Sequence, residues 1–331
     1  MEMNPRHPSA EPAPLLGSDP AFLEALEHVS RLAPLDRPAL VVGERGTGKE
    51  LFAERLHYLS PRWEGPFAKV NCAALTETLL ESELFGHEAG AFTGARNRRR
   101  GRFERADGGT LFLDEVATAS PRLQEQILRV IEYGEFERVG GEQTLKVDVR
   151  VVGATNVDLP ACAAEGKFRA DLLDRLAFDV VTLPPLRARP ADIVDLSDAF
   201  GIRMAKALSH PLFPGFTPSC RKALLAYQWP GNVRELRNVV ERAVYRAGPT
   251  ELPIAEIQID PFESPWRLGG VVPAAPPRPR SSTGFAPSVA AFEKELLQEA
   301  LQVAGGNQTT AARQLGLSYH QFRRLLRKYK L

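Results

Sequence analysis

The sequence predicts an α/β protein with a mainly parallel sheet, followed by a helical region and a separate C-terminal helical domain. Between residues 16 and 190, strand-like apolar runs alternate with helical patterns, and this alternation is typical of βαβ units. After residue 190 the strand-like runs stop, and amphipathic helical patterns such as 234–246 take their place. Near the C-terminus, two short helical patterns flank a glycine.

The strands are expected where short runs of β-branched and other apolar residues occur, because such runs favour buried strands. Five runs meet this description: 39–42, 67–71, 110–113, 149–154 and 180–183. Seven prolines between 261 and 288 give that stretch the composition of a linker. We therefore expect five regions: a flexible arm (1–15), an α/β subdomain (16–190), a helical subdomain (191–258), a Pro-rich linker (259–288) and a C-terminal domain (289–331).

The composition excludes several classes of protein. The 42 Lys and Arg residues nearly balance the 41 Asp and Glu residues, which excludes a uniformly basic nucleic-acid coat. No apolar run is long enough to span a membrane, and the N-terminus lacks the apolar core of a secretory signal. Cys72, Cys162 and Cys220 are too far apart to suggest a disulfide framework or a zinc site. The cysteine usage therefore predicts a reducing, cytoplasmic location.

A glycine-rich loop lies between the strand expected at 39–42 and a helical pattern at 51–59, which is the context of a phosphate-binding loop. Glycines let backbone N–H groups surround phosphate oxygens, the helix N-terminus favours anions, and Lys49 supplies a cation. Glu50 stands where a Ser or Thr that ligates Mg²⁺ is usual. The alternative is a glycine turn with a chance lysine. The candidate ATP-binding residues of this loop are Gly43, Glu44, Arg45, Gly46, Thr47, Gly48, Lys49 and Glu50.

The strand expected at 110–113 ends in two carboxylates, Asp114 and Glu115. In P-loop enzymes such an Asp holds Mg²⁺, and a neighbouring Glu can polarise the attacking water. The pair could instead cap a helix. Asn156 closes another strand and is expected near the γ-phosphate as a polar sensor; the alternative is a turn-forming residue.

Four further segments are specific enough to indicate a family: ELFGHE at 83–88, GAFTGA at 90–95, GRFERADGG at 101–109 and WPGNVREL at 229–236. With these motifs, residues 16–331 resemble the bacterial enhancer-binding proteins, the AAA+ ATPases that activate sigma-54 RNA polymerase. Glu50 is usual in that family. The resemblance implies an AAA+ core with a helical lid, a hexameric ring, and ATP with Mg²⁺ as cofactors.

The resemblance also implies roles for individual residues. Glu115 would pair with Asn71 in one nucleotide state and release it in another. Arg169 and Arg175 would reach into the ATP site of the neighbouring subunit, since an arginine fork suits transition-state phosphate charge. The alternative is salt bridges within the chain to Asp171, Asp174 or Asp179. Arg234 would contact the nucleotide from the lid.

The segment 90–95 is expected to contact sigma-54. It has neither a strand nor a helix period, its glycines permit hinging, and an exposed phenylalanine on such a loop is costly unless it meets a partner. The alternative is an ordinary surface loop that folds its phenylalanine back into the core. The residues of this segment are Gly90, Ala91, Phe92, Thr93, Gly94 and Ala95.

The last 32 residues contain six Lys and Arg residues and no Asp or Glu. A helix, a turn at Gly316 and a second helix over about 319–328 follow helix-turn-helix logic and resemble the Fis-type module of the family. The second helix would enter the major groove of enhancer DNA, and a helix pattern at 288–303 would pair two copies; the alternative is a solvated basic helix without DNA. Thr309 or Thr310 would cap the first helix and Ser318 the second. The candidate DNA-binding residues are Thr309, Thr310, Arg313, Ser318, Tyr319, His320, Gln321, Arg323, Arg324, Arg327 and Lys328.

The short segment before the α/β region leaves no room for the receiver or ligand-sensing domain that most of the family carries, and this leaves regulation open. The resemblance implies a separate inhibitory protein that docks on the ATPase. Trp63, which lies between turn residues, is the candidate docking aromatic unless it is buried under its loop. Two other functions stay open: an AAA+ remodeller of another client, and a DNA-binding regulator whose P-loop senses nucleotide without productive hydrolysis. The segment 90–95 argues against the first, and Asp114, Glu115, Arg169 and Arg175 argue against the second.

Overall fold

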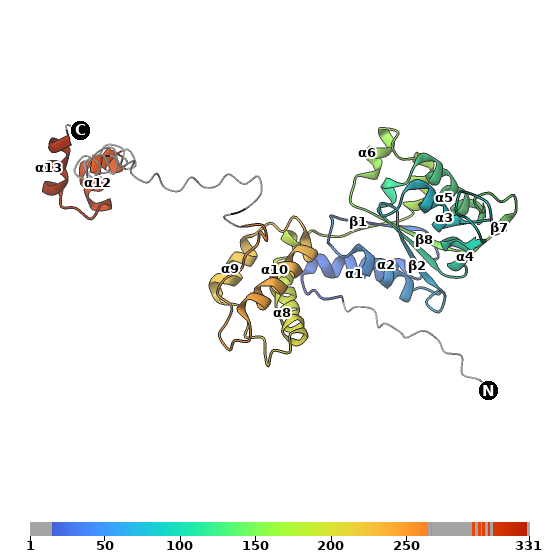
Figure 1. Ribbon diagram of the computed structural model, residues 1–331, viewed down its shortest axis with the longest axis horizontal. Helices are drawn as coiled ribbons and strands as arrows, with labels where there is room; N and C mark the ends of the chain where they lie inside the picture. Colours follow the sequence, from blue (N-terminus) through green and yellow to red (C-terminus); the bar gives the residue numbers. More distant parts are fainter. Residues whose placement is uncertain are drawn as a thin grey trace. The chain divides into compact units, whose positions relative to one another are not determined.

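The computed structural model describes residues 15–263 and 307–329, together with residues 266, 293, 294, 297, 298, 300, 301 and 304. The chain divides into two compact units, 1–259 and 260–331 (Figure 1). Each unit has its own core of buried apolar side chains. The expected arm 1–15 and linker 259–288, and the dimerisation helix expected at 288–303, fall largely outside the described residues.

A five-stranded sheet forms the centre of the first unit. Every neighbouring pair of its strands is parallel. In spatial order the strands are β2 (Phe67–Asn71), β5 (Thr110–Asp114), β8 (Arg150–Thr155), β1 (Ala39–Val42) and β9 (Val180–Thr182). The five predicted strands are therefore confirmed to within one residue at each end.

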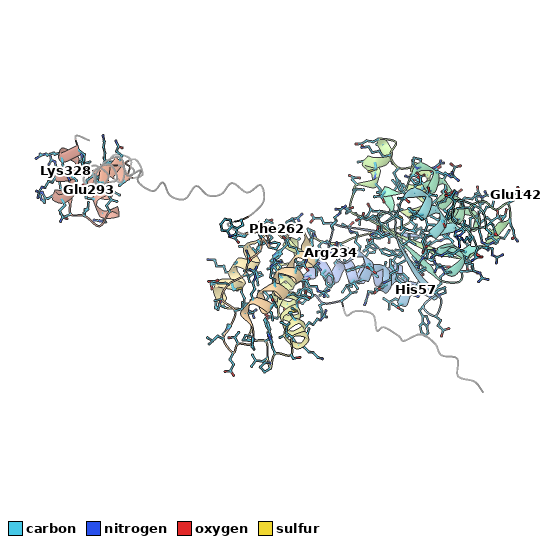
Figure 2. The ribbon with its side chains drawn as sticks, viewed as in Figure 1. His57, Glu142, Arg234, Phe262, Glu293 and Lys328 are labelled. Atoms are coloured by element: carbon cyan, nitrogen blue, oxygen red, sulfur yellow. The ribbon has the colours of Figure 1, made fainter. Side chains whose placement is uncertain are left out.

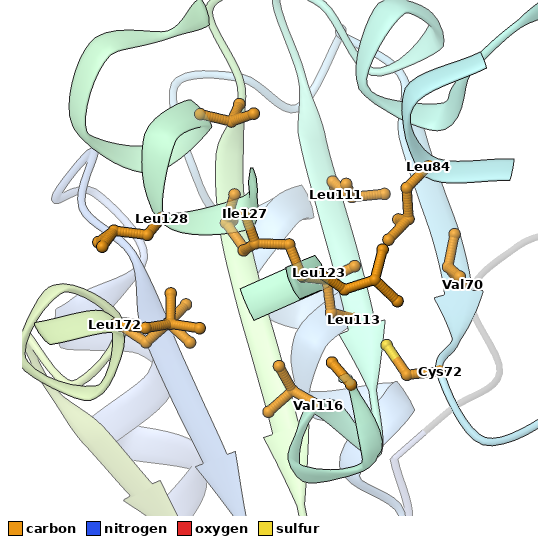
Figure 3. Packing of buried hydrophobic residues seen from close by; sticks show 14 of the residues in the cluster. Val70, Cys72, Leu84, Leu111, Leu113, Val116, Leu123, Ile127, Leu128 and Leu172 are labelled. Atoms are coloured by element: carbon orange, nitrogen blue, oxygen red, sulfur yellow. The ribbon is translucent and has the colours of Figure 1, made fainter. Parts of the chain in front are cut away.

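Helices cover both faces of this sheet (Figure 1), because its strands carry apolar side chains on both sides. On one face pack α1 (Pro20–Leu32) and α2 (Lys49–Tyr58). On the other face Leu123 and Ile127 of α5 pack with Leu111 and Leu113 of β5, and Leu172 of α7 belongs to the same cluster (Figure 3). The helices of this second layer are α3 (Glu77–Phe85), α4 (Arg102–Arg105), α5 (Pro121–Tyr133), α6 (Leu159–Ala164) and α7 (Ala170–Leu176).

Shorter elements complete the α/β part. They are two 3-10 turns, η1 (Val116–Thr118) and η2 (Leu186–Ala188), and two antiparallel hairpins, β3 (Gly86–His87) with β4 (Arg99–Arg100) and β6 (Glu135–Glu137) with β7 (Thr144–Lys146). The sequence analysis did not anticipate the hairpins, because strands of two or three residues are too short to display an alternating pattern. The hairpin β3–β4 brackets the segment 90–95 and fixes where it leaves the core.

Three helices follow the sheet: α8 (Pro190–Ala207), α9 (Pro218–Ala226) and α10 (Asn232–Ala247). They pack around Trp229, which is fully buried and donates its Nε1–H to the Leu224 carbonyl at 2.8 Å. The helical pattern predicted after residue 190 is confirmed. No helix in the described ranges is long and apolar enough to cross a membrane.

The second unit contains α12 (Gln308–Gln314) and α13 (Tyr319–Tyr329), joined by a turn in which Gly316 has a φ of +66°. The predicted cap of the first helix is wrong. Asn307, and not Thr309 or Thr310, is the N-cap, because its side chain accepts the N–H groups of both threonines, which lie inside the first turn. The predicted cap of the second helix is confirmed, since the Ser318 hydroxyl accepts the Gln321 N–H at 3.3 Å.

Candidate functional site

The glycine loop 43–50 turns between β1 and α2. Gly46 and Gly48 adopt φ values of +77° and +102°, a region that side chains with a Cβ disfavour, and α2 starts at Lys49. The Lys49 ammonium donates to the carbonyls of Gly43 and Glu44 at 2.9 and 3.2 Å. Free N–H groups at the start of a helix and a nearby ammonium form an anion site.

A cleft of about 440 Å³ opens over this loop, between the sheet and the helical part. The residues that line the cleft fall into a polar set, called here the polar wall, and an apolar set, called here the apolar wall. Such a lining suits a ligand with a charged end and a flat apolar end. The polar wall contains Arg45, Gly46, Thr47, Gly48, Lys49, Glu50, Asp114, Glu115 and Arg234. The apolar wall contains Leu15, Leu16, Phe22, Leu196, Phe200 and Val233.

The structure therefore brings most of the predicted nucleotide residues together, and it adds residues that the sequence analysis missed. Phe22 of α1 and Arg189, Arg203 and Arg237 of the helical part also line the cleft. Arg189 is almost fully buried, and its guanidinium lies 4.9 Å from the centre of the Phe22 ring. No sequence pattern links these residues to the glycine loop, because they lie far from it along the chain.

Two carboxylates face Lys49 across the cleft. Burial raises the pKa of Asp114, although the Glu115 N–H and Lys49 oppose this shift. Burial also lowers the pKa of Lys49, opposed by the charges of Asp114 and Glu115. Glu115 has a φ of +51° and lies 3.9 Å from the Arg45 guanidinium. A half-buried carboxylate beside a more accessible one is an arrangement in which two acids can take different roles.

Asn71 contacts the first of these carboxylates and not the second. The register of β2 and β5 sets Asn71 opposite Asp114, and its amide donates to Asp114 Oδ2 at 3.4 Å while its carbonyl oxygen accepts the Ala73 N–H at 2.8 Å. No hydrogen bond joins Asn71 to Glu115 in the described part of the chain. The structure thus presents a state in which the expected Asn71–Glu115 pair is not formed.

Glu50 of α2 and Arg234 of α10 also line the cleft. The Glu50 carboxylate is paired with Lys69 at 2.8 Å. Arg234 is exposed on the first turn of α10, where the helical part meets α1 (Figure 2). Its positive charge contributes to the lowered pKa of Lys49, which agrees with a position facing the same ligand.

Three predicted residues lie away from this cleft. Asn156 is exposed and lines a different hollow, beside Glu44 and Arg187. Arg169 pairs with Asp171 at 2.7 Å and Arg175 with Glu132 at 2.8 Å. Within one chain, Arg169 therefore forms one of the ion pairs that the sequence analysis held as the alternative, whereas Arg175 pairs with Glu132, a residue that the sequence analysis did not name.

The segment 90–95 forms a compact projecting loop that the Gly90 N–H closes by donating to the Ala95 carbonyl at 2.7 Å. Thr93 and Gly94 are exposed, and Ala95 is buried. Phe92 is half-buried, in contrast to the exposed anchor that the sequence suggested, because its ring packs edge-on against His87 with centroids 5.0 Å apart. To expose the ring further, a movement of the loop would have to break this contact.

Trp63 lies in the turn after α2, and 57% of its surface is exposed. The interpretation in which this side chain is buried under its loop is therefore wrong. A large exposed aromatic in a turn is an uncommon surface feature and a suitable anchor for a protein partner.

The helix α13 presents a basic surface. Phe322 and Leu326 face inward onto Ala311 and Ala312 of α12, and Leu325 and Tyr329 pack against the same core. Lys328 is bound to Glu293 at 3.2 Å (Figure 2). The other candidates are exposed: Thr309, Thr310, Arg313, Ser318, Tyr319, His320, Gln321, Arg323, Arg324 and Arg327.

A parallel sheet, a P-loop lysine opposite two strand-end carboxylates, and a helical part that closes the same cleft define an AAA+ ATPase. Comparison with protein-family models matches residues 15–182 to the sigma-54 interaction domain, 187–263 to the AAA+ ATPase lid domain and 288–329 to the bacterial regulatory proteins of the Fis family. The chain belongs to the sigma-54-dependent transcriptional activators, AAA+ ATPases with a helix-turn-helix domain that activate sigma-54 RNA polymerase. The family and the enzyme class implied by the resemblance are confirmed.

Individual proteins with similar sequences agree with this assignment. The chain is 61% identical to the Psp operon transcriptional activator of Escherichia coli K12 over 318 residues, which are 96% of this chain and 98% of that protein. It is 45% identical to the Nif-specific regulatory protein of Azotobacter vinelandii, covering 93% of this chain and 57% of that protein. Among solved structures, NtrX of Brucella abortus in complex with ATP matches with a TM-score of 0.69 and 34% identity, over 96% of this chain and 70% of that one.

Proposed function

We propose that this chain acts in the cytoplasm, where it activates the phage shock operon, which serves the response to envelope stress. The observation that carries the proposal is the 61% identity to the Psp operon transcriptional activator over almost the full length of that protein. A relative that aligns from end to end shares its domain order as well as its ATPase core.

In this proposal the cleft binds ATP with its phosphates on the loop 43–50 and its base against Phe22 and the apolar wall. Asp114 is the residue to hold Mg²⁺, which would neutralise charge on the phosphates. The donor set fits this ion, because the carboxylates of Asp114 and Glu115 line the cleft with Lys49 and Mg²⁺ is usually bound by one or two carboxylates, water and substrate phosphates. Glu115 orients and deprotonates the attacking water.

Hydrolysis is proposed to take place between neighbouring subunits of a hexameric ring. Arg169 and Arg175 are both partly exposed and lie outside their own cleft, which supports their use as fingers in the neighbouring site. Arg234 contacts the phosphates from the lid. Asn156 lines a different hollow in this structure, so it would have to turn toward the phosphates to act as the expected polar sensor. Asn71 reports the nucleotide state by exchanging its present contact with Asp114 for one with Glu115.

The projecting loop 90–95 is proposed to grip sigma-54 within RNA polymerase. The Phe92 ring packs on His87 of β3, at the base of the loop, so a movement there would present the ring. The helix α13 binds enhancer DNA, with its cations on phosphates and Tyr319, His320, Gln321 and Arg323 nearest the base edges. Two copies would bring two such helices to one palindromic site.

We also propose that a separate inhibitor, of the kind of phage shock protein A, docks on Trp63. The exposure of this side chain supports the assignment. A substitution of Trp63 by Ala would then leave basal hydrolysis intact and weaken inhibitor binding.

The test of the proposed function is open-complex formation at a phage shock promoter with sigma-54 holoenzyme and the full-length protein. ATP should yield open complexes, and a non-hydrolysable analogue should not. Activity at other sigma-54 promoters but not at this one would refute the operon assignment and leave the family assignment intact.

A further inference from the structure

Asn232 is a fully buried polar residue in an unusual backbone conformation. It starts α10, has a φ of +51°, and donates its N–H to the Trp229 carbonyl at 2.9 Å. An asparagine with a positive φ is uncommon, and such conformations persist where the surroundings hold them in place. The contacts of Asn232 with its neighbours therefore indicate its role.

The Asn232 side chain joins three separate parts of the first unit. Its Oδ1 accepts the Leu186 N–H, in the 3-10 turn η2 that precedes the lid, at 2.7 Å. Its Nδ2 donates to the Arg45 carbonyl at 3.0 Å and to the Glu44 carboxylate at 3.1 Å, both in the phosphate-binding loop. Both ends of the Asn232 amide are thus hydrogen-bonded, and they connect the start of α10 with η2 and with the phosphate-binding loop.

The backbone makes the same connection. The Val233 N–H donates to the Gly46 carbonyl at 3.0 Å, and a Cβ placed on Gly46 would lie 2.3 Å from the Gly231 carbonyl oxygen. The start of α10 therefore rests directly on the phosphate-binding loop, and a side chain at position 46 would separate the two.

Glu44 is held from a second direction. Arg187 of η2 binds both of its carboxylate oxygens, at 2.6 and 2.9 Å. Together the Arg187 and Asn232 hydrogen bonds lower the pKa of Glu44 to about 2. At neutral pH this carboxylate is a fixed acceptor between the loop and the lid.

We propose that Asn232 is a positioning residue for ATP hydrolysis, which holds the backbone of residues 44–46 in the shape that receives the phosphates and makes that shape depend on the position of the lid. The proposal rests on the nucleotide site proposed above. A loop without this support would adopt its binding shape only part of the time, and nucleotide affinity falls in proportion to that fraction.

The test uses Asn232→Gly in the full-length protein, because glycine accepts the positive φ and removes only the side chain. Ser209→Gly is the matched control, since Ser209 is an exposed lid residue with a φ of +57° that lies outside this network. The readouts are the Kd for a fluorescent ATP analogue, KM and kcat for hydrolysis, and the Tm. We expect Asn232→Gly to raise Kd and KM roughly tenfold with kcat little changed, as for loss of one hydrogen bond to a charged group. The control should match the parent.

Unchanged Kd and KM in Asn232→Gly, or equal increases in Ser209→Gly, would overturn the proposal. Lys49→Ala, measured in parallel, separates the two levels of inference: if that variant still binds the analogue normally, the nucleotide site itself is misplaced.

If the glycine variant folds poorly, two further variants test the same proposal. Asn232→Asp retains the shape of the side chain but places a second carboxylate against Glu44, and we expect a larger rise in KM than for glycine. Adding Glu44→Gln removes the repulsion and should recover at least part of the loss. Losses that simply add in the double variant would contradict a direct contribution of the Asn232–Glu44 contact to nucleotide binding.

Discussion

The division of the ATP site between two subunits is testable by mixing inactive variants. Lys49→Ala removes the cation from the cleft, and Arg175→Ala removes the finger, so neither variant alone should hydrolyse ATP. In a mixed ring, an interface is complete where an Arg175→Ala subunit supplies the cleft and a Lys49→Ala neighbour supplies the arginine. For random 1:1 mixing this is about one quarter of the interfaces, so we expect about a quarter of the parental rate.

The structure sets the energetic cost of using Arg175 in this way. Its present ion pair with Glu132 has an N–O distance of 2.8 Å, and 60% of the arginine side chain is exposed. An exposed pair of this kind contributes at most about 1 kcal/mol, so the arginine can leave Glu132 at little cost. Glu132→Gln is the matched control and should change the rate by less than about fivefold.

The assay is phosphate release at protein concentrations that allow assembly, with the two variants mixed before dilution. A mixture no more active than the average of its separate components would refute a finger supplied by the neighbouring subunit. Recovery that disappears on dilution would agree with sites built between subunits.

Three other substitutions test separate parts of the molecule. Asn71→Ala should leave nucleotide binding near normal while uncoupling hydrolysis from sigma-54 contact, and unchanged transcription activation would contradict that role. Arg150→Met should lower the free energy of unfolding by about 3 kcal/mol, because the buried Arg150 guanidinium donates to three carbonyls at the end of α1 and in the loop after it, those of Leu32, Ala33 and Arg37. Urea unfolding measures this loss, with Arg31→Met at an exposed position as the control. A loss below about 1 kcal/mol would count against the prediction. Arg327→Ala should weaken DNA binding and reduce the slope of log K against log salt by about 0.9, and an unaltered slope would remove this residue from the phosphate contacts.

The parallel sheet could be predicted from the sequence because it is buried on both faces. Runs such as Ala39–Val42 are apolar without interruption, and such a run indicates a strand buried on both faces from the local sequence alone. The hairpin β3–β4 and the cap of α12 could not be predicted as securely. In the second case three residues of a capping type, Asn307, Thr309 and Thr310, lie within four positions. Only the first has the extended backbone that the position requires, with a φ of −78° and a ψ of 101°.

The site was predictable to the extent that each of its parts is a local motif. The loop 43–50 and the pair Asp114 and Glu115 are contiguous in sequence, and the parallel register of the sheet brings them to one edge. The pairing of Asn71 with Asp114 depends on that register, which the sequence does not specify at single-residue precision.

The contacts of Asn232 lie beyond the reach of such patterns, for a physical reason. Asn232 and Glu44 are 188 positions apart, and neither residue type is distinctive: an asparagine after Pro-Gly is expected in a turn, and a glutamate in a loop is expected in solvent. What gives them a role is that the lid folds back onto the phosphate-binding loop and buries the amide, where every polar atom must find a partner. A movement of the lid must either break these hydrogen bonds or move the loop with the lid. The contacts that shape the loop therefore also make nucleotide affinity sensitive to lid position.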